Sequence, residues 1–304
     1  MPKPLTPTHG IVPALDELIA LRGHVLAWPP PTRSAERQAG AAPAPLRGRG
    51  MDYAESRPYV AGDDARHIDW RVTARTGRMH TKVFHAERDR VTLLLADTAP
   101  TLYFGTRRCF KSVQAARAGA LAAWAAQRSG DRIAALRGST VEAPRPPQGG
   151  VRGALRALDA LARWYGAPQP DDAGLERALE ATVRVVKPGA RVVALLDPRS
   201  VDGCTDARLT ALAAHHDAIA VLLVDPFELD PPVDHLAFAT TDGEVELDLD
   251  EDVVRRQWDL AFAARYGRAR ERLLQLGWRT LVLRTDEAPD IVLGSLLPRR
   301  REAA

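Results

Sequence analysis

The chain has 304 residues, of which 45% are hydrophobic and 27% charged, a composition ordinary for a globular protein. Its formal net charge of +3 is too small to indicate nucleic-acid binding. Cys109 and Cys204 are the only cysteines, which excludes a disulfide framework, and neither lies in a zinc-binding pattern. Because no stretch resembles a signal peptide or a membrane span, we expect a soluble, cytoplasmic protein.

The N-terminal region, residues 1–50, is expected to be an irregular extension ahead of the main domain. Residues 13–22 have the apolar spacing of a short amphipathic helix. From residue 28 to residue 50 the composition shifts to Pro, Ala, Gly and Arg. This shift predicts a linker, because few of these side chains could bury enough area to offset the entropy of the chain. At the other end, residues 299–304 are predicted to be a basic tail.

Between these ends, residues 51–298 alternate apolar strands with helices. Strands are predicted at 79–86, 91–96, 131–136, 190–196, 218–224 and 279–284, with 139–143 as a candidate hairpin partner and a charged, alternating stretch at 244–249. Helices are predicted at 107–128, 150–165, 173–184, 203–216, 251–276 and 288–297. This alternation predicts an α/β fold with a doubly wound, mostly parallel, Rossmann-like sheet. We expect 91–96 to be its central strand, because this run is the most uniformly apolar and opens the first crossover.

The segment from Arg57 to Arg75, RPYVAGDDARHIDWRVTAR, concentrates carboxylates, guanidinium groups and rings. Two adjacent carboxylates repel each other by roughly 1 kcal/mol in water and about 4 kcal/mol at the effective dielectric of a protein surface. Arginines or a metal ion must therefore neutralise the pair Asp63–Asp64. Two interpretations stay open: an ion network that clamps a turn, and a binding surface. The candidate binding residues are Arg57, Tyr59, Gly62, Asp63, Asp64, Arg66, Asp69, Trp70 and Arg75.

The tryptophans show no spacing typical of a stacking platform. We therefore expect Trp70, Trp124, Trp164 and Trp258 to be packing anchors.

Three apolar strands end in an aspartate: Asp97, Asp197 and Asp225. In an open α/β sheet, ligands bind outside the carboxyl ends of the strands, where the winding reverses. If 91–96 is the first strand and 190–196 the first strand on its other side, Asp97 and Asp197 flank that crevice. Carboxylates with nearby hydroxyl groups suit Mg²⁺, whereas a strand-end aspartate can also simply cap the following turn.

Residues 97–101, Asp-Thr-Ala-Pro-Thr, resemble the Asp-x-Ser-x-Ser loop of von Willebrand factor A domains, which holds a metal ion. The resemblance implies a degenerate Mg²⁺ site made by Asp97, Thr101 and Asp197. Ala99 stands where a hydroxyl ligand is expected. The segment APQPDDAGLERAL offers Asp171 and Asp172 but no threonine for the third loop of that family.

The motif RPYVAGDDARHIDW at residues 57–70, with the following segments through residue 136, closely resembles the bacterial domain-of-unknown-function family number fifty-eight. The resemblance covers roughly residues 45–298. It implies a von Willebrand A-like fold and a partnership with a MoxR-type AAA+ ATPase that matures target proteins. The chain itself has no GxxxxGK[ST] phosphate-binding loop, so ATP chemistry would belong to that partner.

Two functions are compatible with these patterns. The first is a non-enzymatic protein-interaction module that binds a MoxR-type ATPase and an unknown target protein. The alternative is a magnesium-dependent phosphoryl-transfer enzyme, such as a nuclease, with Asp63, Asp64, Asp97 and Asp197 around two ions. The expected contacts of the interaction module are Asp97, Thr101 and Asp197, with the segment from Arg57 to Arg75 bracing or extending that surface.

Overall fold

The structure is a computed structural model that describes residues 10–29, 51–60, 63–86, 90–240 and 243–294. The chain divides into a larger unit, residues 1–39 with 90–304, and a smaller unit, residues 40–89. The predicted domain of residues 51–298 therefore includes parts of both units. The predicted linker began at residue 28, but Trp28 packs against a core of the larger unit; its remainder from residue 30 to residue 50 and the basic tail at 299–304 lie outside the described residues.

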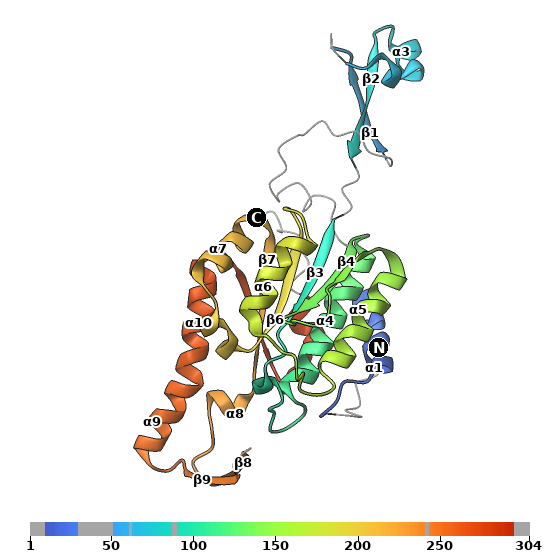
Figure 1. Cartoon of the computed structure of the whole chain (residues 1–304). Coiled ribbons are helices and arrows are strands. Elements are labelled where there is room, and N and C mark those ends of the chain that lie inside the picture. The colour runs from blue at the N-terminus through green and yellow to red at the C-terminus, as the bar shows by residue number, and fades with distance from the viewer. Residues whose placement is uncertain (1–9, 30–50, 61–62, 87–89, 241–242, 295–304) are drawn as a thin grey trace. The chain divides into compact units, whose positions relative to one another are not determined.

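Six strands form the sheet of the larger unit (Figure 1). Their order is β10 (Arg279–Arg284), β7 (Asp217–Val224), β6 (Arg191–Leu196), β3 (Val91–Ala96), β4 (Arg132–Arg137) and β5 (Arg145–Gln148). All neighbours are parallel except β4 and β5. The structure confirms one sheet with 91–96 inside it. The hairpin partner, however, is 145–148 and not 139–143, and its two prolines suit an edge strand, where no inner ladder needs their missing N–H groups.

Helices cover both faces of this sheet, which confirms the doubly wound α/β fold. Alternate side chains of β3 enter two separate cores, Leu94 and Ala96 in one and Leu93 and Leu95 in the other. The first core is covered by α1 (Leu15–Ala20), α2 (Arg22–Ala27), α4 (Lys111–Arg128), α5 (Gly150–Trp164) and α11 (Pro289–Leu293). The second is covered by α6 (Gly174–Val185), α7 (Asp206–His215) and α10 (Ala263–Gln275). Within the described residues, no helix combines the length and hydropathy needed to cross a membrane.

The N-terminal helices belong to the fold and are not an irregular extension. Leu18, Leu21 and Val25 are fully buried in the first core, and the carbonyl oxygen of Leu18 accepts a hydrogen bond from the indole of Trp124 at 3.0 Å. The sequence predicted the first helix, but it gave no sign that α1 and α2 complete the cover over α4.

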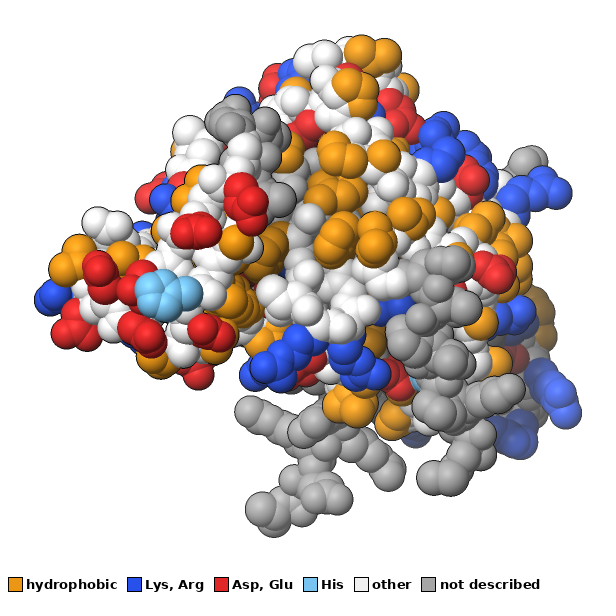
Figure 2. Space-filling model, turned by 90° about the horizontal axis from the view of Figure 1, so that it is seen from below, with side chains coloured by type: hydrophobic (Ala, Val, Ile, Leu, Met, Phe, Trp, Pro, Cys, Tyr) orange, Lys and Arg blue, Asp and Glu red, His pale blue; other side chains and the backbone are white. Residues whose placement is uncertain are grey.

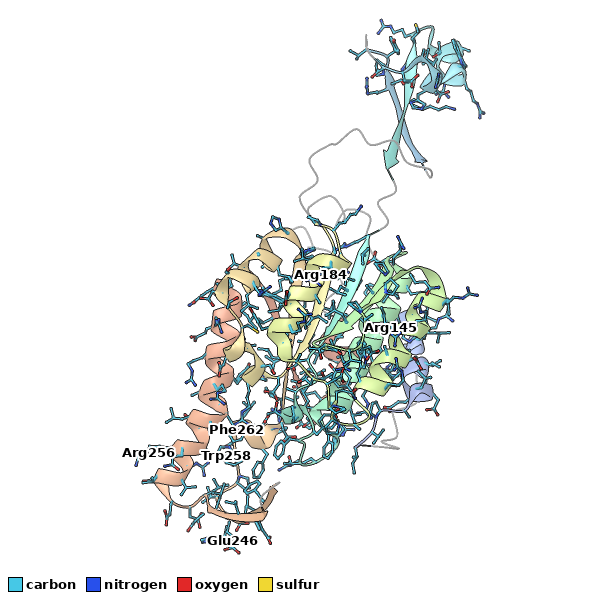
Figure 3. All side chains as sticks on the ribbon, in the orientation of Figure 1. Arg145, Arg184, Glu246, Arg256, Trp258 and Phe262 are labelled. Carbon is cyan, nitrogen blue, oxygen red and sulfur yellow. The ribbon has the colours of Figure 1, made fainter. Side chains whose placement is uncertain are left out.

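The prediction of one continuous helix at 251–276 is wrong. It is two helices, α9 (Asp252–Ala261) and α10, because the backbone leaves helical geometry at Phe262, with φ −125° and ψ −77°. The Phe262 and Trp258 rings pack with centroids 4.4 Å apart, and Trp258 also contacts Phe227 of α8 (Pro226–Leu229) and Phe238 (Figure 3). These rings pack the hairpin of β8 (His235–Thr240) and β9 (Gly243–Asp248) against α8 and α9 of the same unit.

The smaller unit contains an antiparallel pair of strands and one short helix. Strand β1 (Met51–Pro58) pairs with β2 (His80–Ala86), and α3 (Trp70–Thr76) lies between them in the chain. Only the strand at 79–86 was predicted here. Helix α3 ends at Gly77, whose φ of 68° is a conformation that glycine adopts without a Cβ clash.

We predict that Gly138→Ala destabilises the larger unit by about 3 kcal/mol, since this is overpacking against backbone that cannot move aside. A Cβ atom at this position, directly after β4, would overlap the carbonyl oxygen of Gly174. Gly23→Ala in α2 is the matched control, because its Cβ would meet nothing within 4 Å. Urea unfolding of both variants measures the effect, and equal midpoints would contradict the packing described here.

Candidate functional site

Asp97 and Asp197 meet at the carboxyl edge of the sheet, as the strand order requires. Strands β3 and β6 are neighbours, and the backbone N–H of Asp197 donates to Asp97 Oδ2 at 2.9 Å. Asp97 Oδ1 accepts the N–H of Ala99 at 3.0 Å, and the Ser200 hydroxyl also bonds this carboxylate. Burial raises the pKa of Asp97 to about 6, although these hydrogen bonds act against the rise.

A buried lysine, Lys111, bridges Asp197 of this pair and a third acid, Glu228. Its Nζ atom donates to Asp197 Oδ2 and to Glu228 Oε1, both at 2.7 Å, and its side chain is 1% exposed. Burial alone would lower the pKa of Lys111, but the two carboxylates outweigh burial and raise it. The lysine is therefore a permanent cation in a closed network. Asp197 Oδ1 accepts the Arg199 N–H at 2.8 Å and so begins the 3-10 helix Pro198–Gly203.

The third strand-end aspartate, Asp225, ties three loops together. Its carboxylate accepts the N–H and the hydroxyl of Thr106, at 3.1 and 2.6 Å, and the hydroxyl of Thr285 at 2.5 Å. It also caps α8, because Asp225 Oδ1 accepts the N–H of Phe227. In return, the N–H of Asp225 donates to Glu228 Oε2 at 2.9 Å. Glu228 thus serves the cap and the lysine network at once.

The acids predicted for the third loop lie beside the first loop. Asp172 Oδ1 accepts the Thr98 hydroxyl at 2.7 Å, and Asp171 accepts two bonds from Arg137 Nη2 at 2.7 and 2.8 Å. Thr101, predicted as a metal ligand, has a buried hydroxyl with no hydrogen-bond partner in the described part of the chain.

The carboxylates of this edge do not fit a divalent cation. All four oxygens of Asp97 and Asp197 already accept hydrogen bonds, and the Lys111 ammonium lies 2.7 Å from Asp197. A second cation on the same carboxylate would face that ammonium at short range in a region of low dielectric. Among the three predicted ligands, only the Thr101 hydroxyl has no hydrogen-bond partner in the described part of the chain, so a metal at the carboxylates would compete with the N–H and ammonium groups bound there.

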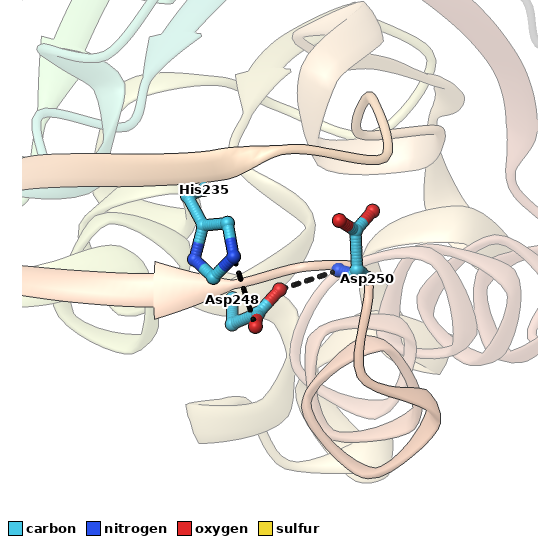
Figure 4. Close-up of side chains that lie close together, drawn as sticks. All are labelled: His235, Asp248 and Asp250. Atoms are coloured by element: carbon cyan, nitrogen blue, oxygen red, sulfur yellow. Dashed lines mark hydrogen bonds and ion pairs between the residues drawn. The ribbon is translucent and has the colours of Figure 1, made fainter.

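A second group of metal-capable side chains lies on the β8–β9 hairpin. His235, Asp248 and Asp250 offer ligand atoms within 4.8 Å of one another (Figure 4). His235 Nε2 lies 3.1 Å from Asp248 Oδ2, and the backbone N–H of Asp250 donates to Asp248 Oδ1 at 3.0 Å, so the Asp248 carboxylate already has two partners. Acidic side chains gather at this end of the face shown in Figure 2, among them the exposed Glu244, Glu246, Glu251 and Asp252. This surface would repel phosphate.

In the smaller unit, the predicted arginine–carboxylate pair is Arg57–Asp63. Arg57 Nη2 lies 2.6 Å from Asp63 Oδ1, and Asp63 Oδ2 accepts the Val60 N–H at 2.9 Å. The hydrogen bond from Arg57, followed by that from the Val60 N–H, holds the pKa of Asp63 below its ordinary value. Asp64 instead caps the 3-10 helix Ala65–His67 through the Arg66 N–H at 3.0 Å. The clamp interpretation is therefore supported for Asp63.

Asp69 fixes the start of α3. Its Oδ2 accepts the Ser56 hydroxyl at 2.6 Å, and its Oδ1 accepts the N–H groups of Arg71 and Val72 at 3.2 Å. The Ser56 bond is the first cause of a lowered pKa at Asp69. Since an aspartate cap fixes the chain direction at its helix, Asp69 also determines where Trp70 lies.

The other candidate residues of this segment divide into two groups. Tyr59 is half-buried, its hydroxyl donating to the Asp63 carbonyl at 3.3 Å, while Arg66 and Arg75 are exposed. Gly62 lies outside the described residues. The expectation that Trp70 is a packing anchor is wrong, because its side chain is 69% exposed. The same expectation is confirmed for the buried Trp124, Trp164 and Trp258.

Sequence reasoning missed Lys111 and Glu228. One signal was available: lysine occurs only at Lys3, Lys82, Lys111 and Lys187, and Lys111 follows the first strand-end loop. Nothing in the sequence pointed to Glu228 as its partner, because the two are separated by 117 residues.

The fold and the closed carboxyl edge define a doubly wound α/β protein whose strand-end acids are bonded by groups of the chain itself. Comparison with known proteins identifies the family of this chain and several relatives. The sequence profile of the family described as "Protein of unknown function DUF58" matches residues 55–269, and the chain belongs to this family.

The chain is 31% identical over 188 residues to uncharacterized proteins of Mycobacterium bovis and of two strains of Mycobacterium tuberculosis. The match covers 62% of this chain and 59% of each relative, so the chain spans about three fifths of their length.

We predict that Lys111→Met lowers the free energy of unfolding by roughly 3–5 kcal/mol, because it leaves Asp197 and Glu228 buried without their cation. The loss should shrink as the pH falls, since the unpaired carboxyls then take up protons. Lys187→Met, at an exposed lysine, is the matched control. Urea unfolding at pH 5 and pH 8 tests both variants, and a Lys111→Met protein as stable as the parent would refute the network.

We predict that the Asp97 carboxyl titrates near pH 6 in the folded protein, against an ordinary value of 3.8. Between these values the folded state holds more protons than the unfolded state. The contribution of this group to the free energy of unfolding therefore decreases as the pH rises from about 4 to about 6. The ¹³C NMR shift of the carboxyl, assigned from its absence in Asp97→Asn, gives the midpoint. A midpoint below 4.5 would show that hydrogen bonding outweighs burial.

Proposed function

We propose that the chain is a non-enzymatic protein-interaction module that acts with a MoxR-type AAA+ ATPase on a target protein. The observation that carries this proposal is the internal closure of the carboxyl edge by Lys111, Asp197 and Glu228. Groups that bond one another in a buried network are poorly placed to bind substrate or transfer protons. The rigid edge instead supports the surrounding loops, which are free to contact another protein.

The identity of the partner comes from the family resemblance. Members of the family are thought to adopt a von Willebrand A-like fold and to act with MoxR-type ATPases. The doubly wound sheet is compatible with that fold.

The contact residues expected from the sequence need revision. Asp97 and Asp197 are 2% and 0% exposed, so they support a binding surface and cannot themselves be that surface. The exposed side chains at this edge come from the loops after β3 and β4, including Arg107 and Val141. Val141 is 82% exposed, so its apolar side chain is accessible to a partner.

The phosphoryl-transfer alternative has less support. Both oxygens of Asp63 are engaged by Arg57 and Val60, and the oxygens of Asp97 and Asp197 are engaged as described above. A two-metal site needs carboxylates with oxygens directed at the ions. The acidic face at the β8–β9 hairpin would also repel a nucleic-acid backbone.

We predict that the purified chain binds a MoxR-type ATPase of its own organism and changes that ATPase's hydrolysis rate at least twofold, while hydrolysing no ATP itself. A coupled ATPase assay and size-exclusion chromatography of the mixture measure both effects. The proposal fails if the ATPase neither binds nor responds while the chain alone cleaves nucleic acid with Mg²⁺.

Val141→Asp should weaken this binding at least tenfold if the carboxyl-edge loops make the contact. Val183→Asp is the matched control, because Val183 is 78% exposed near the C-terminal end of α6. Its neighbour Arg184 lies at the opposite end of the sheet from the hairpin (Figure 3). Equal losses in the two variants would place the contact elsewhere.

A further inference from the structure

The smaller unit exposes three large apolar side chains. Trp70 is 69% exposed, Val60 60% and Met79 48%. Leaving a side chain of this size in water forfeits about 1.5–3 kcal/mol of burial free energy. Among the described side chains of this unit, only Ile68, Asp69 and Thr81 are buried.

Backbone hydrogen bonds bring these three residues to one end of the unit. The N–H of Tyr59, next to Val60, donates to the Met79 carbonyl at 2.9 Å. The N–H of Asp69, next to Trp70, donates to the His80 carbonyl at 2.8 Å. The segment 79–80 is therefore flanked by the chain leading to Val60 on one side and to Trp70 on the other.

Arginines surround this end without acidic partners. Arg71 and Arg75 lie one turn apart on α3, and Arg78 follows its last turn; all three are exposed. They form no ion pair with a carboxylate in the described part of the chain, whereas Arg57 pairs with Asp63. Like charges at this helical spacing destabilise a helix by about 0.2–0.5 kcal/mol, so a bound anionic group would stabilise α3.

We propose that Val60, Trp70 and Met79 form an apolar anchor, rimmed by Arg71, Arg75 and Arg78, for an acidic segment of a protein partner. The segment would place one large apolar side chain against Trp70 and Asp or Glu side chains against the arginines. An apolar centre with an exposed tryptophan and a charged rim is the usual anatomy of an interaction hot spot. This inference stands on the smaller unit alone, whether or not the partner is the ATPase.

A protein segment suits the surface better than a nucleic acid. Trp70 offers a single indole, and its apolar neighbours Val60 and Met79 are aliphatic, whereas single-stranded nucleic acids need successive stacking rings.

The first test asks whether Trp70 is accessible in the free, full-length chain. Acrylamide quenching of tryptophan emission, compared between the parent and Trp70→Phe, isolates the contribution of Trp70. We expect the quenching of a solvent-exposed indole. A Trp70 contribution that resists quenching would overturn the proposal, because the anchor would then be covered already.

The second test selects ligands for the full-length chain from a library of random 12-residue peptides, with Trp70→Ala as counter-selection. We expect selected peptides to carry several Asp or Glu residues and one large apolar residue. Their affinity, measured by fluorescence anisotropy, should fall at least tenfold in Trp70→Ala. It should also fall in Arg71→Glu/Arg75→Glu and decrease with added salt.

Arg184→Glu and Val183→Ala are the controls, since both positions are exposed outside the smaller unit. Circular dichroism melting of each variant separates lost binding from lost folding. Selected peptides without acidic residues, or an affinity in Trp70→Ala within twofold of the parent, would refute the proposal. So would a single-stranded DNA oligonucleotide or phosphatidylserine vesicles that bind through Arg71 and Arg75 and are not displaced by the peptides.

Discussion

The contact on which the larger unit depends is the buried ammonium of Lys111 between Asp197 and Glu228. A doubly wound sheet leaves a crevice where its winding reverses, and in many proteins a ligand fills it. Here a side chain of the protein supplies the positive charge at that place. Desolvating these three charges is costly, and the network is favourable only because the remaining polar atoms of Asp197 and Glu228 are also bonded. Asp225, after β7, also bonds the loops that follow β3 and β10 at the same edge.

Much of this arrangement could be predicted from local patterns. Apolar runs closed by aspartates defined the strands, and the parallel order placed Asp97 beside Asp197, because the carboxyl ends of neighbouring parallel strands meet. The long-range partners could not be predicted in the same way. Which acid neutralises Lys111 depends on how α8 packs, and a sequence pattern carries no information on contacts between residues 117 positions apart. The break at Phe262 also had no signal in the sequence, because helical spacing predicts a continuous helix there.

The family motif shows how one segment can serve two purposes. Its acids are largely structural: Asp63 binds Arg57 and the chain at Val60, and Asp69 caps α3. The sequence suggested such a clamp because adjacent carboxylates need neutralising groups. The exposure of Trp70 could not be predicted, since a tryptophan among charged residues is usually a packing anchor. The acids hold the backbone while the indole remains in solvent, and the structural clamp thus presents the residue that we propose as the anchor.

The lysine network also has a consequence for the growing chain on the ribosome. Lys111 is made 86 residues before Asp197 and 117 residues before Glu228. During that interval the ammonium has no native partner, so burying α4 against β3 would strand a charge in the nascent core. Contacts of such sequence separation slow folding, because a long loop must close before they form. Stable burial of α4 therefore waits until the chain has emerged beyond residue 228, and the interval is one in which a chaperone would find exposed apolar surface.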